Sequence, residues 1–137
     1  MSNDVKQMTL NREEILCLYA LMSTREQGLI EDTYHFGDYR EQRVCINKDN
    51  DLWKVYCCER GQKFDIETFD DCKKACIRVI WYCSYNKEEV ENAIQYFLVT
   101  IQNSNTLSDE DIDNFITKYE FNIDTKGYNK KLVKELN

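Results

Sequence analysis

The chain of 137 residues has no proline and only four glycines, so it lacks the stretches from which stiff or flexible interdomain linkers are built. Its apolar runs are also far shorter than the roughly 20 residues that cross a bilayer. The first ten residues, MSNDVKQMTL, have neither the basic start nor the apolar centre of a signal peptide. These absences predict one domain over residues 1–137, with a frayed tail at about 126–137, no membrane contact and a cytoplasmic location.

Histidine is nearly missing as well, since His35 is the only one. No two cysteines have the Cys-x-x-Cys spacing that is typical of structural zinc sites. The chain also lacks the Gly-x-Ser-x-Gly, phosphate-binding glycine-loop and His-Glu-x-x-His motifs. We therefore expect no metal, no cofactor and no enzyme, although paired acids such as Glu13 and Glu14 leave a small hydrolase as the weaker alternative.

Cysteine, in contrast, is plentiful, with seven residues. An odd number fits poorly with a closed set of disulfides and favours free thiols in a reducing compartment. Cys72, Cys76 and Cys83 recur at helical spacing, whereas Cys57 and Cys58 are neighbours in a predicted strand and point to opposite faces. Free cysteine behaves as a small apolar side chain, so we expect these thiols to belong to the core.

Acidic residues outnumber basic residues by 25 to 18, which gives a formal net charge of −7. Such a chain repels phosphate backbones, so a direct nucleic-acid ligand is not expected. The same field attracts basic proteins, because opposite potentials steer an encounter. Solubility alone would also account for the charge.

The first half of the chain predicts a helix and then antiparallel strands. Asn11 and Glu14 have capping-box spacing ahead of a largely apolar helix. Phe64 and Ile66 alternate with acids, which predicts a strand with one buried and one wet face. Residues 29–41 have no clear period and leave strand and loop both open. The expected elements are a helix at residues 11–23 and strands at residues 44–46, 52–58 and 63–69.

The second half predicts three helices, each behind a pair of residues with capping-box spacing. These pairs are Thr68 with Asp71, Asn86 with Glu89, and Ser108 with Asp111. Apolar positions recur at helical spacing behind them: Cys72, Ala75, Cys76, Val79, Ile80 and Cys83; Val90, Ala93, Ile94, Phe97, Leu98 and Ile101; Ile112, Phe115, Ile116 and Tyr119. The predicted fold is therefore α+β, an antiparallel meander of three to four strands with an N-terminal helix and C-terminal helices packed on one face.

Two segments are the candidate partner-binding surface. Residues 31–41, EDTYHFGDYRE, combine acids with tyrosines, and interfaces favour aromatic anchors within a charged rim. The Glu-Arg-Gly sequence at residues 59–61 predicts a turn at the end of the sheet. Aromatic cover for the first helix and an exposed ion pair in the turn would also account for these residues. The candidate residues are Asp32, Tyr34, Asp38, Tyr39, Glu41, Glu59 and Arg60.

Residues 52–76, LWKVYCCERGQKFDIETFDDCKKAC, resemble the small immunity proteins of bacterial polymorphic-toxin and contact-dependent inhibition systems. The resemblance rests on a Trp-x-Val-Tyr strand, a Glu-Arg-Gly turn, a strand that ends in Phe69, and an acid-led helix with the pair Ala75-Cys76. It implies a cytoplasmic protein that binds the toxic C-terminal domain of a cognate effector, often a basic nuclease, and blocks it. It implies no catalytic residues.

We therefore expect a stoichiometric inhibitor whose partner is a toxin domain, most simply a basic one. A cytosolic adaptor or regulatory module that binds another protein is the alternative. The acidic composition and the lack of catalytic motifs fit both of these functions.

Overall fold

Helices and strands are segregated along the chain much as the sequence predicts. The computed structural model describes residues 8–119 and 123–124, so the predicted tail at residues 126–137 lies outside the described residues. The α+β class is confirmed, but the order of elements differs from the prediction, because β1 precedes the first helix and β6 follows the last. The elements are β1 (Met8–Thr9), α1 (Arg12–Glu26), β2 (Tyr34–Phe36), β3 (Val44–Asp49), β4 (Leu52–Glu59), β5 (Gln62–Phe69), α2 (Cys72–Tyr82), α3 (Lys87–Gln102), the 3-10 helix η1 (Ser104–Thr106), α4 (Asp109–Tyr119) and β6 (Ile123–Asp124).

The main sheet is mixed rather than wholly antiparallel. Its strand order is β2-β3-β4-β5, and β3, β4 and β5 form the predicted antiparallel meander. β2 instead pairs in parallel with β3, with Tyr34 beside Val44, so the antiparallel prediction is wrong for this edge. The parallel pairing is possible because residues 37–43 return the chain to the end of the sheet where β2 began. That return starts at Gly37, whose φ of +127° suits a residue without a Cβ.

Both hairpin turns place two consecutive residues in the left-handed region. Asn50 and Asp51 have φ values of +53° and +68°, and Arg60 and Gly61 have values of +53° and +76°. Consecutive positive φ values are typical of type I′ turns, whose twist matches that of the flanking strands. Both predicted turns are therefore confirmed.

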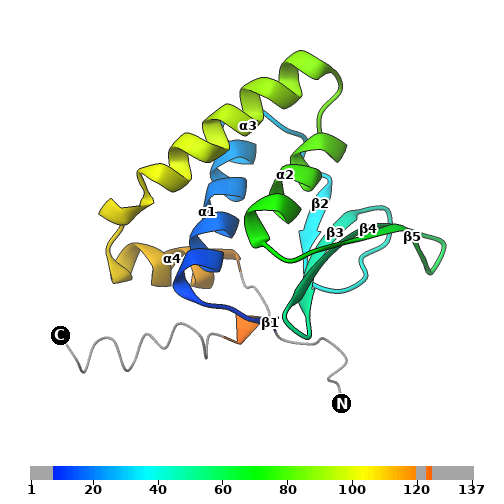
Figure 1. Ribbon diagram of the computed structural model, residues 1–137, viewed down its shortest axis with the longest axis horizontal. Helices are drawn as coiled ribbons and strands as arrows, with labels where there is room; N and C mark the ends of the chain where they lie inside the picture. The colour runs from blue at the N-terminus through cyan, green and yellow to red at the C-terminus, as the bar shows by residue number, and fades with distance from the viewer. Residues whose placement is uncertain (1–7, 120–122, 125–137) are drawn as a thin grey trace.

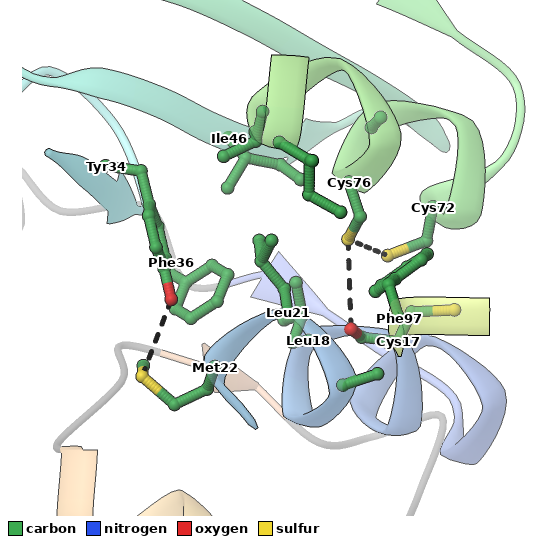
Figure 2. Close-up of a cluster of buried hydrophobic side chains, with 14 of the residues drawn as sticks. Cys17, Leu18, Leu21, Met22, Tyr34, Phe36, Ile46, Cys72, Cys76 and Phe97 are labelled. Carbon is green, nitrogen blue, oxygen red and sulfur yellow. Dashed lines mark hydrogen bonds between the residues drawn. The ribbon is translucent and has the colours of Figure 1, made fainter. Parts of the chain in front are cut away.

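The helices lie on one side of the main sheet, and α2 is the helix next to it (Figure 1). α2 contacts β3, β4 and β5, while α1 and α3 pack against α2 and against each other. No helix among the described residues is both long and apolar enough to cross a bilayer. Core side chains between these layers include Leu18, Leu21, Ile46 and Phe97 (Figure 2).

The cysteines of α2 fill this core, as predicted. Cys72, Cys76 and Cys83 are all buried, and none of them is in a disulfide. Burial raises the pKa values of the Cys76 and Cys83 thiols. These thiols therefore remain neutral and pack as small apolar groups.

Most of the predicted helix caps form. Asn11 and Glu14 make a complete capping box at α1, and Ser108 and Asp111 exchange the equivalent hydrogen bonds at α4. Asn86 accepts a hydrogen bond from the N–H of Glu89 at 2.9 Å. The prediction for α2 is wrong. Thr68 lies in β5, and Asp71 itself is the N-cap, because its side chain accepts from Lys73 N–H at 2.6 Å. The predicted apolar positions Ile116 and Tyr119 have side chains outside the part of the molecule that the structure describes.

β5 does not bury the face that its alternation predicts. Phe64 and Ile66 are 42% and 55% exposed. The pairing of β5 with β4 shifts in register between Val55 and Cys57, and Asp65 at this shift has a φ of +54°. Such a bulge inserts one residue and turns the following side chains to the other face. A strict period of two therefore fails in this strand.

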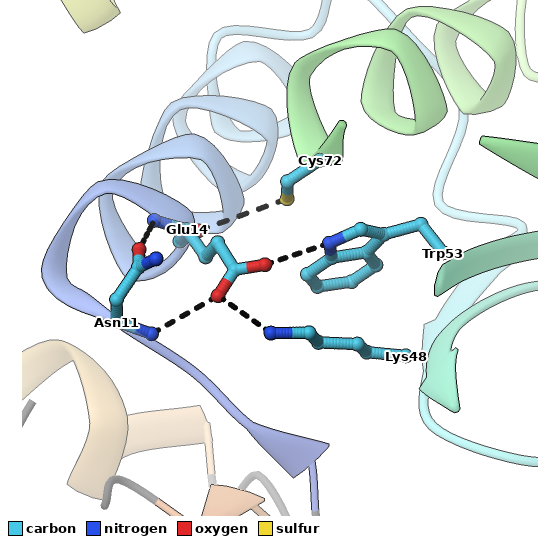
Figure 3. Close-up of polar contacts among 5 residues, drawn as sticks. All are labelled: Asn11, Glu14, Lys48, Trp53 and Cys72. Carbon is cyan, nitrogen blue, oxygen red and sulfur yellow. Dashed lines mark hydrogen bonds and ion pairs between the residues drawn. The ribbon is translucent and has the colours of Figure 1, made fainter. Parts of the chain in front are cut away.

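Glu14 joins the start of α1 to the sheet (Figure 3). One carboxylate oxygen lies 3.0 Å from Lys48 Nζ on β3, and the other accepts a hydrogen bond from Trp53 Nε1 on β4 at 2.8 Å. The side chains of Glu14 and Lys48 are only 14% and 16% exposed. A single carboxylate thus caps a helix, neutralises a largely buried lysine and satisfies a buried indole.

Replacing Glu14 by alanine should lower the free energy of unfolding by about 3 kcal/mol, because it removes the carboxylate that pairs with Lys48 and accepts the indole N–H of the buried Trp53. Glu13→Ala is the matched control, since Glu13 is an exposed acid in the same helical turn and its loss should change stability by less than about 0.5 kcal/mol. Urea denaturation followed by circular dichroism measures both. Equal effects of the two variants would contradict the role assigned to Glu14.

Candidate functional site

The two predicted binding segments meet at one end of the sheet. Glu41 accepts hydrogen bonds from the backbone N–H groups of Arg60 at 2.8 Å and Gly61 at 3.3 Å. The hydroxyl of Tyr39 donates to Glu41 and accepts from the N–H of Gly61 at 2.6 Å. These contacts fasten residues 37–43 to the β4–β5 turn. We call this assembly the junction.

Asp38 holds the junction against the outer face of the sheet, the face opposite the helices. Its Oδ1 accepts a hydrogen bond from the Tyr56 hydroxyl at 2.7 Å and lies 2.8 Å from Lys63 Nζ. Partial burial acts to raise the pKa of Asp38, but the hydrogen bonds from Lys63 and Tyr56 outweigh it and lower the pKa to about 2. Asp38 is therefore ionised and paired within the chain.

The acids of the junction have a structural role that the sequence does not predict. Asp38 is paired with Lys63, and the carboxylate of Glu41 is used by the turn. Hydrogen bonds to that carboxylate, first from Tyr39 and then from the turn, lower the pKa of Glu41. Both acids order the loop rather than offer unpaired charge to a partner. Glu59 and Arg60 remain exposed at the tip of the turn.

Tyr34 and Asp32 lie outside the junction. Tyr34 is only 7% exposed, its hydroxyl lies 3.5 Å from the sulfur of Met22, and burial raises its pKa. Its assignment to the surface is wrong, because β2 turns this side chain towards the helices (Figure 2). Asp32 is exposed and forms ion pairs with Arg25 at 3.2 Å and Arg43 at 3.9 Å.

Exposed aromatic side chains gather near the end of α2, where the sequence interpretation placed no site. Trp81 is 52% exposed and Tyr85 is 78% exposed, and Tyr82 is half-buried beside them. The guanidinium of Arg78 lies 4.5 Å from the ring centroid of Trp81 and 5.3 Å from that of Tyr82. We call Arg78, Trp81, Tyr82 and Tyr85 the aromatic surface.

Glu67 of β5 fixes the centre of the aromatic surface. Its Oε1 accepts hydrogen bonds from Arg78 Nε at 2.6 Å and from the Tyr82 hydroxyl at 3.2 Å. The Arg78 hydrogen bond, opposed by slight burial, lowers the pKa of Glu67. The arginine is thereby held over the rings with its charge balanced.

A hollow of about 500 Å³ lies between the junction and β5. The junction contributes one wall of this hollow and β5 contributes the other. The lining residues are Thr33, Gln42, Arg43, Val44, Cys57, Cys58, Glu59, Phe64 and Asp65. The hollow and the aromatic surface both border β5, the first through Phe64 and the second through Glu67.

The spacing of apolar residues in α2 indicates from sequence alone that Arg78 and Trp81 lie off the buried face. The stripe that predicts burial in α2 runs from Cys72 through Cys76 to Cys83 and leaves Arg78 and Trp81 off the buried face. An off-stripe tryptophan beside an arginine indicates an interface. Phe64 gave the opposite signal, because alternation predicts its burial whereas it is 42% exposed.

The ionisable groups near the junction have shifted pKa values. Among residues 8–119, no group of three or more histidines, cysteines or acids is placed to hold a metal ion. Burial, followed by the nearby Arg40 and Arg43, lowers the pKa of His35. Burial also raises the pKa values of Cys45 and Cys57, which leaves these thiols protonated and weakly nucleophilic at neutral pH.

Comparison of the chain with protein-family models, curated proteins and solved structures gives no match. The resemblance of residues 52–76 to immunity proteins therefore stays a prediction. The candidate site therefore rests on the contacts, burial and charges described above.

Asp38→Asn should lower the free energy of unfolding at neutral pH, and this loss should shrink as the pH falls. The folded-state pKa of about 2 lies below the ordinary value of 3.8, so the ionised carboxylate adds stability above the ordinary value that is lost as the pH falls through about 2. Because the side chain is 36% exposed, we expect a loss of no more than about 1 kcal/mol at neutral pH.

Urea denaturation between neutral pH and a pH of about 2 measures the effect. Asp51→Asn, in the exposed β3–β4 turn, is the control. The difference between Asp38→Asn and the unmodified chain should shrink as the pH falls towards 2. A difference of constant size over the whole range would contradict the ion pair assigned to Asp38.

Proposed function

We propose that this chain is an immunity protein, a cytoplasmic stoichiometric inhibitor that binds the toxic C-terminal domain of a cognate bacterial effector. The observation that carries the proposal is the aromatic surface, where Arg78 lies over the rings of Trp81 and Tyr82 and Tyr85 is 78% exposed. Tryptophan, tyrosine and arginine are the residues that most often dominate the binding energy of protein interfaces. The resemblance of residues 52–76 to the immunity family adds independent support.

The aromatic surface is ordered before any partner arrives. Arg78 is held both by Glu67 and by the rings of Trp81 and Tyr82. A side chain that is already fixed loses little conformational entropy on binding, so more of its contact energy contributes to affinity. This order favours a role as a tight binder rather than a transient one.

The junction extends the binding region to the size that a specific complex needs. Such complexes bury about 800 Å² on each partner, over roughly 20 to 30 residues. In the proposed interface, Asp38, Tyr39 and Glu41 hold the loop in shape, while Glu59 and Arg60 meet the partner. The hollow between the junction and Phe64 accepts a protruding partner side chain.

We propose a basic toxin domain as the partner. Exposed acids lie around the binding region, among them Glu59 and Asp65, and the net charge of the chain is −7. Opposite potentials would accelerate association and make it sensitive to salt. Inhibition would then follow from covering basic groups around the toxin active site.

Trp81→Ala should weaken the complex by at least about 2 kcal/mol, mainly through faster dissociation, because truncated anchors expose their partner pocket to water. Val99→Ala is the matched control, since Val99 is a 47% exposed apolar residue on α3, outside the binding region. Surface plasmon resonance with the toxin domain that we expect the gene immediately upstream to encode measures both. Unchanged dissociation in Trp81→Ala would place the interface elsewhere.

Co-expression distinguishes an immunity protein from an adaptor. The chain should restore growth to cells that produce the neighbouring toxin domain, and Trp81→Ala should restore it less well. An adaptor would bind a different protein and give no protection. Failure of the unmodified chain to protect, with the toxin domain shown to be active, would overturn the proposed function.

A further inference from the structure

Two buried thiols lie in contact on the outer face of the sheet, apart from the proposed interface anchors. The sulfur atoms of Cys45 on β3 and Cys58 on β4 are 3.4 Å apart. Cys45 is paired with Tyr56, so Cys58 is its diagonal neighbour on the same face. These three side chains are almost fully buried and form a small cluster separate from the main core.

A loop, rather than a helix, covers this cluster. Tyr39 packs against it, and the Cys45 thiol lies 4.0 Å from the carbonyl oxygen of Arg40. Residues 37–43 are held down chiefly by the surface hydrogen bonds of the junction. Segments with few buried contacts open locally far more often than a core does. The thiol pair can therefore be exposed without unfolding the domain.

The other close thiol pair is placed differently. The sulfur atoms of Cys72 and Cys76 are 3.9 Å apart, but both residues lie on α2 (Figure 2). The Cys76 thiol also contacts the carbonyl oxygen of Cys17 on α1 at 3.9 Å. Cys72 lines a separate hollow of about 700 Å³, whereas Cys76 is fully buried. This pair is an internal control for any chemistry at Cys45 and Cys58.

We propose that Cys45 and Cys58 are a site of reversible thiol oxidation, at which a small hydroperoxide converts the two thiols into a disulfide that crosslinks β3 and β4. The thiolate of Cys58 first attacks the peroxide, so that an S–O bond forms, the O–O bond breaks and water leaves. The sulfur of Cys45 then attacks the Cys58 sulfenic acid, an S–S bond forms and a second water leaves. Two thiols and one hydrogen peroxide give one disulfide and two waters.

The surroundings of the two thiols favour this order of attack. Cys58 is among the residues that line the hollow, whereas Cys45 is not. Burial raises the pKa of Cys45 to about 12, so Cys45 rarely becomes a thiolate while the loop is closed. Cys58 thus meets the oxidant first. Cys45, whose sulfur already contacts that of Cys58, then attacks the Cys58 sulfenic acid.

The crosslink would alter the junction. A disulfide brings its sulfur atoms to about 2.05 Å, so the two side chains must move closer than they are in the reduced chain. Tyr39 packs directly against them and is fastened to the β4–β5 turn. Oxidation would therefore shift the fastened loop whatever partner the chain binds.

The test treats the full chain, carrying Cys57→Ser, with hydrogen peroxide and then maps it by trypsin and mass spectrometry. The substitution is needed because Cys57 and Cys58 share the tryptic peptide 55–60, whereas Cys45 lies in 44–48. We expect the intact mass to fall by two hydrogen atoms, a crosslink between these two peptides, and full reversal by dithiothreitol. Cys72 and Cys76 should remain open to alkylation after denaturation.

Fragmentation of the same crosslinked peptides from the unmodified chain separates Cys57 from Cys58 without any substitution. Cys45→Ser should instead leave a sulfenic acid on Cys58 that dimedone traps. The proposal is overturned if peroxide leaves Cys45 and Cys58 as thiols, or if Cys58 pairs only with another cysteine or another molecule.

Tyr39→Ala tests the role of the loop as a cover. It should accelerate disulfide formation about threefold or more, because thiol reactivity follows exposure. Tyr85→Ala, which removes an exposed tyrosine away from the thiol pair, should leave the rate unchanged. Equal rates in the two variants, both shown by circular dichroism to be folded, would contradict access through the loop.

Discussion

The carboxylate of Glu14 is the interaction on which the arrangement of layers depends. It completes the cap of α1, pairs with Lys48 on β3 and accepts the indole N–H of Trp53 on β4 (Figure 3). Burying a lysine and an indole without partners would cost several kcal/mol. The contact therefore fixes where α1 meets the sheet, and the core between α1, α2 and β4 is built around that position.

Local features of this fold could be predicted from the sequence, while features set by distant contacts could not. The caps at Asn11 and Ser108 and the stripe of α2 depend on residues within one or two helical turns. The parallel edge strand and the inward Tyr34 depend on how residues 37–43 return the chain, which no period encodes. The register shift at Asp65 turns Ile66 to the opposite face from Phe64, which simple alternation does not predict.

In the candidate site, too, the sequence predicts local features but not the contacts between distant residues. Composition identified residues 31–41 and the turn at 59–61 as candidates, and the structure brings parts of both together. Composition could not reveal that Asp38 and Glu41 are already paired within the chain. In the proposed complex, the aromatic surface around Trp81 rather than these acids would supply most of the binding energy, with the junction beside it. The proposed oxidation of the thiol pair beneath the junction would connect the redox state of the chain to the same loop.

Hydrogen–deuterium exchange of the chain, alone and bound to the proposed toxin partner, tests the central claim most directly. The account predicts new protection in residues 57–65 and 78–85, which carry the hollow and the aromatic surface. The exposed faces of α3 and α4 should exchange equally in both states. Protection confined to α3 and α4, with no change around Trp81, would contradict the proposed binding region.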